Sequence, residues 1–142
     1  MRVLVTGGAG FIGSNYVRRV LDGTLTGVTR LTVLDKLTYA GSLSNLAVLP
    51  RGSFDFIQGD ICDLALVEKL AKEHDAIVNF AAESHVDRSI LGSREFVMTN
   101  VLGTQTLLDA ARIGSVETFV QISTDEVYGL SLIHISEPTR PY

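Results

Sequence analysis

The feature that most constrains the fold is a glycine-rich segment, TGGAGFIG, at residues 6–13. It follows an apolar run at residues 3–5 and precedes residues 11–21, where apolar side chains recur with the period of an amphipathic helix. The glycines fit both the GxGxxG and the GxxGxxG spacing. One would permit a tight turn, one would let a pyrophosphate approach the backbone, and the last would let helix and strand pack closely. This order is typical of a dinucleotide-binding turn.

An acidic residue stands where such a turn needs one. Asp35 lies 22 residues after Gly13, at the end of a second apolar run at residues 31–34. A carboxylate there can bind both hydroxyls of a ribose and repels a 2′-phosphate, which favours NAD over NADP. The alternative is a glycine-rich turn followed by a solvated aspartate. Asp60, after a third run, fits the adenine edge or, equally, a helix cap.

The remaining pattern alternates strands with helices. Apolar runs at residues 54–57, 76–80 and 119–122 predict three more strands, and periodic segments at 64–72 and 95–112 predict two more helices. The sequence therefore predicts an α/β fold with a doubly wound parallel sheet of five strands. The side chains expected to face inward are those of Ile12, Tyr16, Val17, Val20, Leu66, Val67, Leu70, Val97, Val101, Leu107, Leu108 and Ala111.

Composition excludes several classes of function. At 142 residues, the chain has room for one domain. A net charge of −4 without a basic stripe argues against a nucleic-acid partner. Cys62 is the single cysteine, so we expect no disulfide and no zinc site, and a reducing, cytoplasmic location. No run approaches the roughly 18 apolar residues of a spanning helix, and no signal peptide is evident, so we expect no membrane association.

Four motifs together resemble one family. They are residues 6–13, DKLTYAG at 35–41, AAESHVDRSI at 81–90 and STDEVYG at 123–129. This set is similar to the dTDP-glucose 4,6-dehydratases, which are extended short-chain dehydrogenase/reductases, and the similarity runs from Met1 to Gly129. Related epimerases and decarboxylases usually lack the Asp125-Glu126 pair. Without the resemblance, residues 123–126 would be interpreted as a strand-to-helix turn with capping residues.

The resemblance implies a reaction and its residues. The family converts dTDP-glucose to dTDP-4-keto-6-deoxyglucose, using NAD to accept a hydride and return it. By matching, Glu126 would remove the proton on carbon 5, Asp125 would protonate the departing hydroxyl on carbon 6, and Thr124 would bind the hydroxyl on carbon 4. Two carboxyl groups in opposite protonation states suit this chemistry. The family also implies a homodimer, formed in part by the helix expected at residues 95–112.

The same matching implies a set of cofactor contacts. Ser84 would also lie near the sugar nucleotide, and His85 is interpreted as a loop residue rather than an acid or base. The residues expected to contact NAD are Gly7, Gly10, Phe11, Ile12, Gly13, Asp35, Lys36, Leu37, Thr38, Asp60, Ile61, Phe80, Ala81, Ala82, Glu83, Ser84 and Thr99.

The sequence also departs from the family. It contains no Tyr-x-x-x-Lys pair and no second, substrate-binding domain. Residues 130–140 are the codon-by-codon translation of a common transposase sequencing adapter. We therefore interpret residues 1–129 as a partial NAD-binding domain and 130–142 as a non-native tail, the alternatives being a divergent tail or a frameshift. We expect a truncated, inactive dehydratase. The alternatives are an epimerase or decarboxylase and a non-catalytic NAD-sensing module.

Overall fold

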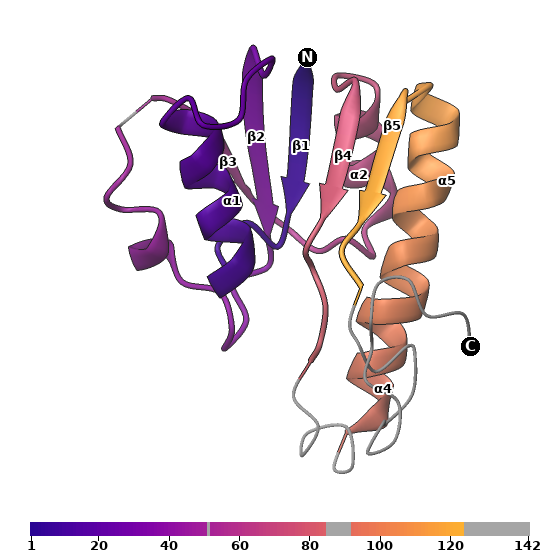
Figure 1. Cartoon of the computed structure of the whole chain (residues 1–142). Coiled ribbons are helices and arrows are strands. Elements are labelled where there is room, and N and C mark those ends of the chain that lie inside the picture. The colour runs from indigo at the N-terminus through magenta and orange to yellow at the C-terminus, as the bar shows by residue number, and fades with distance from the viewer. Residues whose placement is uncertain (51, 85–91, 124–142) are drawn as a thin grey trace, which may run out of the picture.

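Five of the apolar runs form one parallel sheet. The computed structural model describes residues 1–50, 52–84 and 92–123. Within them the strand order is β3-β2-β1-β4-β5, and every pairing is parallel. All strands therefore end at the same edge of the sheet (Figure 1). The predicted five-stranded α/β sheet is confirmed. The strands are β1 (Arg2–Thr6), β2 (Arg30–Asp35), β3 (Asp55–Gln58), β4 (Ala76–Asn79) and β5 (Thr118–Gln121).

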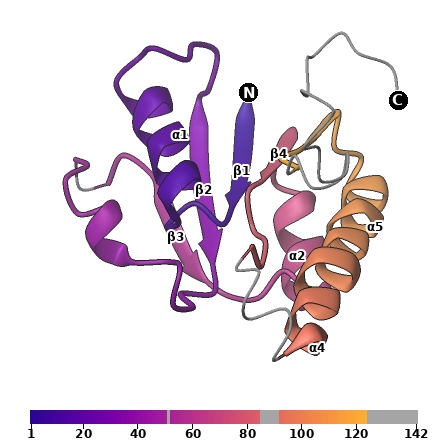
Figure 2. The same ribbon diagram turned by 60° about the horizontal axis from the view of Figure 1, so that its bottom comes forward.

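Helices cover both faces of this sheet. Figure 2 shows α1 (Phe11–Leu21) on one side of the strands, and α2 (Leu64–Ala71) with α5 (Thr104–Gly114) on the other. A short α4 (Ser93–Phe96) continues into a π-helical stretch, η2 (Val97–Gly103), which leads directly into α5. A short 3₁₀ turn, η1 (Leu43–Asn45), lies between β2 and β3. This is the doubly wound arrangement that the sequence predicts.

The core is divided into two clusters by the alternation of side chains along each strand. Val3 and Val5 of β1 point to the α1 side and pack with Val17. Leu4 of the same strand points to the other side and packs with Leu107 of α5. A strand with helices on both faces needs apolar residues at every position, which explains the unbroken apolar run in β1.

An ion pair between Arg2 and Asp75 lies at the edge of the sheet where the strands begin. Asp75, just before β4, accepts hydrogen bonds from the backbone and the guanidinium of Arg2 at the start of β1. These bonds lower the pKa of Asp75 to about 2. Because Arg2 begins β1 and Asp75 directly precedes the neighbouring β4, the pair fixes where these two strands begin relative to one another.

The prediction for the last long helix is partly wrong. Leu107 and Ala111 are buried as expected, but Val97, Val101 and Leu108 are 57%, 61% and 48% exposed. The apolar residues of this segment form two stripes: the stripe with Leu107 and Ala111 is buried in the core, whereas the stripe with Val97, Val101 and Leu108 is exposed. Periodicity finds both stripes and cannot rank them. The continuous helix expected at residues 95–112 also contains the π-helical stretch, which periodicity does not reveal.

One inward assignment in α1 is also wrong. Val17 is fully buried, whereas Ile12 is 61% exposed. Ile12 is in the first turn, which extends past the edge of the sheet, and it lines a cavity there instead of the core.

Candidate nucleotide-binding site

The glycine turn packs backbone against backbone. Gly7 has φ of +69°, and a Cβ built on it would lie 2.5 Å from the amide nitrogen of Ala81. A Cβ on Gly13 would collide with the carbonyl oxygen of Gly7. These two glycines are therefore required by the fold itself. Gly10 differs, since its Cβ would meet only the oxygens of Gly7 at 3.3 Å and Ala40 at 3.9 Å.

The turn opens into a helix end that is free to bind an anion. Gly10 is the N-cap of α1, no side chain caps the helix, and its first turn contains no acidic residue. The amides of a first helical turn lack carbonyl partners within the helix and carry the positive end of its dipole. Phe11, Ile12 and Gly13 of this turn line the cavity. An anionic group such as a phosphate suits this position.

Asp35 holds the glycine turn against the end of β2. Its Oδ2 accepts a hydrogen bond from the amide of Ala9 at 2.8 Å, and its Oδ1 accepts one from the amide of Leu37 at 2.8 Å. The residue is only 8% exposed. Each carboxylate oxygen has a second lone pair, so Asp35 retains the capacity to accept hydrogen bonds from a ribose.

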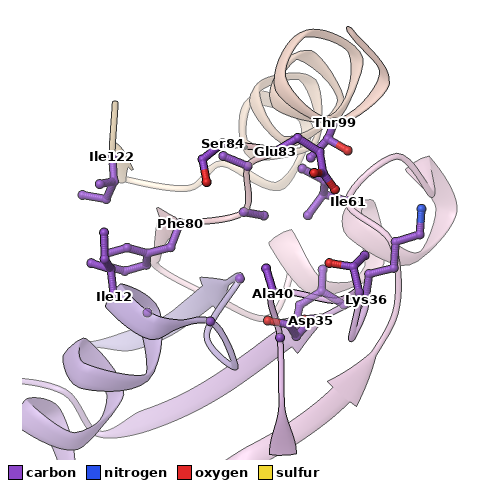
Figure 3. Close-up of a pocket in the computed structure, with 18 of the residues that line it drawn as sticks. Ile12, Asp35, Lys36, Ala40, Ile61, Phe80, Glu83, Ser84, Thr99 and Ile122 are labelled. Carbon is purple, nitrogen blue, oxygen red and sulfur yellow. The ribbon is translucent and has the colours of Figure 1, made fainter. Parts of the chain in front are cut away.

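A cavity of about 400 Å³ joins the glycine turn to the ends of the strands. Figure 3 shows a charged end, with Asp35 and Lys36, and an apolar end, with Ile12, Phe80 and Ile122. Such a volume is typical of small-molecule sites. Of the residues expected to contact NAD, the cavity is lined by Gly7, Gly10, Phe11, Ile12, Gly13, Asp35, Lys36, Thr38, Asp60, Ile61, Phe80, Ala81, Ala82, Glu83, Ser84 and Thr99.

Leu37 is the exception. It is absent from the lining, and its side chain packs against the α1 cluster of the core while its amide binds Asp35. Its φ of +57° turns the chain at this point. Leu37 therefore supports the wall of the cavity without lining it. For the other residues, contact with NAD stays a prediction.

Several lining residues were not singled out from the sequence. Ala40 and Gly41 belong to the motif at residues 35–41, although the cofactor contacts predicted from that motif end at Thr38. Ile122 and Ser123 follow β5, where position at the end of a parallel strand is itself a signal. The residues missed are Leu34, Ala40, Gly41, Gly59, Ile122 and Ser123.

Asn100 fixes the loop after β4. Its Oδ1 accepts a hydrogen bond from the amide of Glu83 at 2.8 Å, and its Nδ2 donates to the carbonyl of Glu83 at 2.8 Å. The Glu83 side chain accepts a hydrogen bond from the hydroxyl of Tyr39 at 3.0 Å. The loop is thus tied both to η2 and to the segment after β2. Nothing in the sequence pattern distinguishes Asn100, because the pairing joins residues 17 positions apart.

An ion pair occupies the charged end of the cavity. Lys36 Nζ lies 2.7 Å from Asp60 Oδ2. The hydrogen bond from Lys36 to Asp60 raises the pKa of Lys36. Partial burial alone would raise the pKa of Asp60, but the Cys62 amide and the Lys36 ammonium outweigh it and hold that pKa below its ordinary value. Both groups are therefore charged at neutral pH.

A buried polar chain crosses the sheet beneath the cavity. The hydroxyl of Thr6 on β1 donates to Asn79 Oδ1 on β4, and Asn79 Nδ2 donates to Gln121 Oε1 on β5 at 2.8 Å. Thr6 and Asn79 are fully buried. Gln121 Nε2 in turn donates to the carbonyl of Ile122 at 3.3 Å, and Ile122 is followed by Ser123, the last residue described. The expected catalytic residues Thr124, Asp125 and Glu126, and also His85, lie outside the described residues.

Two negative findings apply to residues 1–50, 52–84 and 92–123. They bring together no group of three or more His, Cys, Asp or Glu side chains suited to a metal ion. They also contain no helix with the length and apolar character needed to cross a membrane.

The glycine turn, the open end of α1 and the acid at the end of β2 define a dinucleotide-binding domain of the doubly wound α/β class. A family model described as GDP-mannose 4,6 dehydratase matches residues 4–142, and the chain belongs to this family.

Individual relatives agree with this assignment. The dTDP-glucose 4,6-dehydratase of Streptomyces niveus is 58% identical over 91% of this chain and 39% of its own length. The crystal structure of DesIV, a dTDP-glucose 4,6-dehydratase from Streptomyces venezuelae with NAD bound, matches with a TM-score of 0.87 and 54% identity over 91% of this chain and 41% of that one. A UDP-glucose 4-epimerase from Thermotoga maritima matches with a TM-score of 0.74 and 30% identity over 85% and 37%. The chain thus spans about two fifths of these relatives.

The hydrogen bonds of Asp35 generate a stability prediction. Asp35→Asn replaces one acceptor by a donor, so either Ala9 or Leu37 loses its partner at a buried site. We expect a loss of about 1–3 kcal/mol in the free energy of unfolding, measured by urea titration. Asp55→Asn, which removes an exposed carboxylate paired with Arg30, is the matched control and should cost at most about 1 kcal/mol. Equal losses in the two variants would contradict the anchoring role of Asp35.

Proposed function

We propose that this cavity binds NAD. The observation that carries the proposal is the meeting, in one cavity, of an uncapped helix end, a backbone free of side chains at Gly10, and the carboxylate of Asp35. These groups suit a pyrophosphate and a ribose joined to one another. The solved structure of DesIV contains NAD, which supports the same ligand here. Asp35 favours NAD over NADP because it would oppose a 2′-phosphate.

The two ends of the cavity suggest an orientation. The adenosine half suits the charged end beside Asp35 and Asp60, where hydroxyls and a purine edge find acceptors. The nicotinamide half suits the apolar end, which Ile12, Phe80 and Ile122 line (Figure 3). NAD supplies hydride transfer when bound. The reacting end would then lie beside Ser123, immediately before the Thr124-Asp125-Glu126 segment.

Gly10 offers a test that separates ligand binding from folding. A Cβ at Gly10 would lie 3.3 Å from the carbonyl oxygen of Gly7, a tight contact but not the overlap found at Gly7 and Gly13, and it would enter the space expected for the pyrophosphate. Gly10→Ala should therefore weaken NAD binding about tenfold or more while lowering the melting temperature less than Gly13→Ala does, as measured by calorimetric titration and thermal unfolding. Asn15→Ala, at an exposed position of the same helix, should leave the dissociation constant unchanged. Unaltered NAD affinity in Gly10→Ala would refute this site.

We further propose that the whole enzyme converts dTDP-glucose to dTDP-4-keto-6-deoxyglucose. Glu126 removes the proton on carbon 5, Asp125 protonates the departing hydroxyl on carbon 6, and Thr124 binds the hydroxyl on carbon 4. Identity of 54% to DesIV, against 30% to the Thermotoga epimerase, supports the dehydratase over the epimerase alternative. The presence of the Asp125-Glu126 pair in the sequence supports it as well.

A chimera tests the two carboxyl groups. Residues 1–129 replace the matching segment of the Streptomyces niveus dehydratase, and the chimera should form the 4-keto-6-deoxy product. Glu126→Gln should block exchange of the carbon-5 hydrogen with solvent deuterium, whereas Asp125→Asn should retain exchange and slow product formation. Each should lower the rate by about 10² to 10⁴.

The control for the chimera is Glu117→Gln, which makes the same change at an exposed residue just before β5 and should keep the parent rate. Parent-like turnover in either the Asp125 or the Glu126 variant would rule out the assigned role.

We also propose that the full-length enzyme is a homodimer with η2 and α5 at its interface. The exposed stripe of Val97, Val101 and Leu108 supports this, because an apolar helix face of this kind usually packs against a partner. In the chimera, Val101→Glu should shift sedimentation toward the monomer. Val48→Glu, at a 76% exposed valine on a different face, should not. Dimerisation unaffected by Val101→Glu would remove this interface from consideration.

We also propose a cytoplasmic location, the absence of a nucleic-acid partner and a non-native origin for residues 130–142. The lone cysteine supports a cytoplasmic location, and the net charge of −4 supports the absence of a nucleic-acid partner. Residues 130–142 are proposed to be a translated adapter, although the family model matches through residue 142. Resequencing the gene past the codon for Gly129 tests this, and a natural gene that encodes the same thirteen residues would disprove it.

A further inference from the structure

A cation lies beside the acid expected to select the cofactor. Lys36 follows Asp35 directly and is the one lysine or arginine among the described residues that line the cavity. Basic side chains at this end of a dinucleotide site are the groups that accept a 2′-phosphate. Asp35 therefore favours NAD, whereas Lys36 by itself would favour NADP. The charge of Asp35 alone does not explain selection against NADP.

The ammonium of Lys36 is already engaged. Its Nζ lies 2.7 Å from Asp60 Oδ2, and Figure 3 shows the side chain extending away from the Asp35 carboxylate. Asp60 is itself fixed, because its Oδ1 accepts a hydrogen bond from the amide of Cys62 at 2.9 Å. The carboxylate that holds Lys36 is thus positioned by the backbone after β3, whereas Lys36 is the more exposed partner, at 59% against 33%.

We propose that Asp60 is a specificity-determining residue, which withholds Lys36 from a 2′-phosphate by pairing with it. This inference rests on the proposed binding of NAD in the cavity. Asp35, Lys36 and Asp60 together carry one net negative charge, and the carboxylate of Glu83, which also lines the cavity and acts electrostatically on Lys36, adds to it, so a phosphate dianion is repelled. Without the charge of Asp60, the three groups sum to zero, and the ammonium loses the partner that holds it away from the ribose.

The geometry of Asp35 supports a division of labour between the two carboxylates. Asp35 is 8% exposed and already accepts two backbone hydrogen bonds, so it is fixed in place and does not reach the ammonium. Asp60 lines the cavity from the neighbouring strand end and takes the cation instead. Asp35 receives the ribose hydroxyls, and Asp60 keeps the adjacent cation from compensating for a phosphate placed on one of them.

The test measures selectivity in the 142-residue chain. Dissociation constants for NAD and NADP are obtained by calorimetric titration at low ionic strength for four proteins: the parent chain, Asp60→Asn, Lys36→Met, and the double variant. Asparagine keeps an oxygen able to accept the hydrogen bond from Cys62 and removes only the charge. Asp63→Asn is the matched control, since it removes a carboxylate three residues away, and asparagine is an equally good cap for α2.

We expect Asp60→Asn to shift the ratio of the two dissociation constants toward NADP by about fivefold or more, because a freed lysine gains a charged acceptor. The shift should disappear in the double variant, be absent from Asp63→Asn, and shrink as salt is added. An unchanged ratio in Asp60→Asn would overturn the proposal. A shift that persists in the double variant would also overturn it, since relief of repulsion alone would then account for the gain.

The titration of the parent chain distinguishes a failure of the proposed NAD site from a failure of the role proposed for Asp60. If the parent chain binds no NAD, the site itself is wrong, and this inference fails with it. If the parent binds NAD and the Asp60→Asn ratio is unchanged, only the role of the ion pair is refuted.

Discussion

The site depends on one buried carboxylate that satisfies two backbone amides. Asp35 joins the glycine turn, through Ala9, to the end of β2, through Leu37. The two N–H groups meet different oxygens of this buried side chain, and a carboxylate has two acceptor oxygens whereas an amide or hydroxyl has one. The acid usually regarded as a reader of the ribose thus also shapes the turn that receives the pyrophosphate.

The rest of the cavity is built by tying loops to neighbouring elements. Gly7 brings the turn into contact with Ala81, Asn100 holds Glu83 by both of its backbone groups, and Asn79 joins β1 to β5 beneath them. The first contact is close backbone packing and the other two are hydrogen bonds, and each joins segments that are far apart in the sequence. A cavity bounded in this way is organised before any ligand arrives, which lowers the ordering cost of binding.

Local chemistry explains which parts of the structure the sequence predicts. The glycine turn, Asp35 and all five strands follow from residue types and spacings within short windows. Asn100, Tyr39 and the exposure of Val101 do not, because each depends on which segments meet across the fold. Leu37 shows the opposite limit, since it lies within a predicted cofactor motif but turns its side chain into the core. A motif identifies a segment, whereas the backbone conformation decides which of its side chains face the cavity.

The four glycines of the turn are not equally required by the fold. A Cβ would overlap backbone at Gly7 and Gly13 and the Val33 side chain at Gly8, whereas at Gly10 it would make only a tight contact, 3.3 Å from the carbonyl oxygen of Gly7. A descendant of this domain that no longer bound a nucleotide would still need the first three and would tolerate a change at Gly10 more readily. Most glycines of this motif are therefore required by the fold, so the motif mainly identifies the fold. The glycine at the middle position is the one whose retention most directly indicates that a ligand is bound.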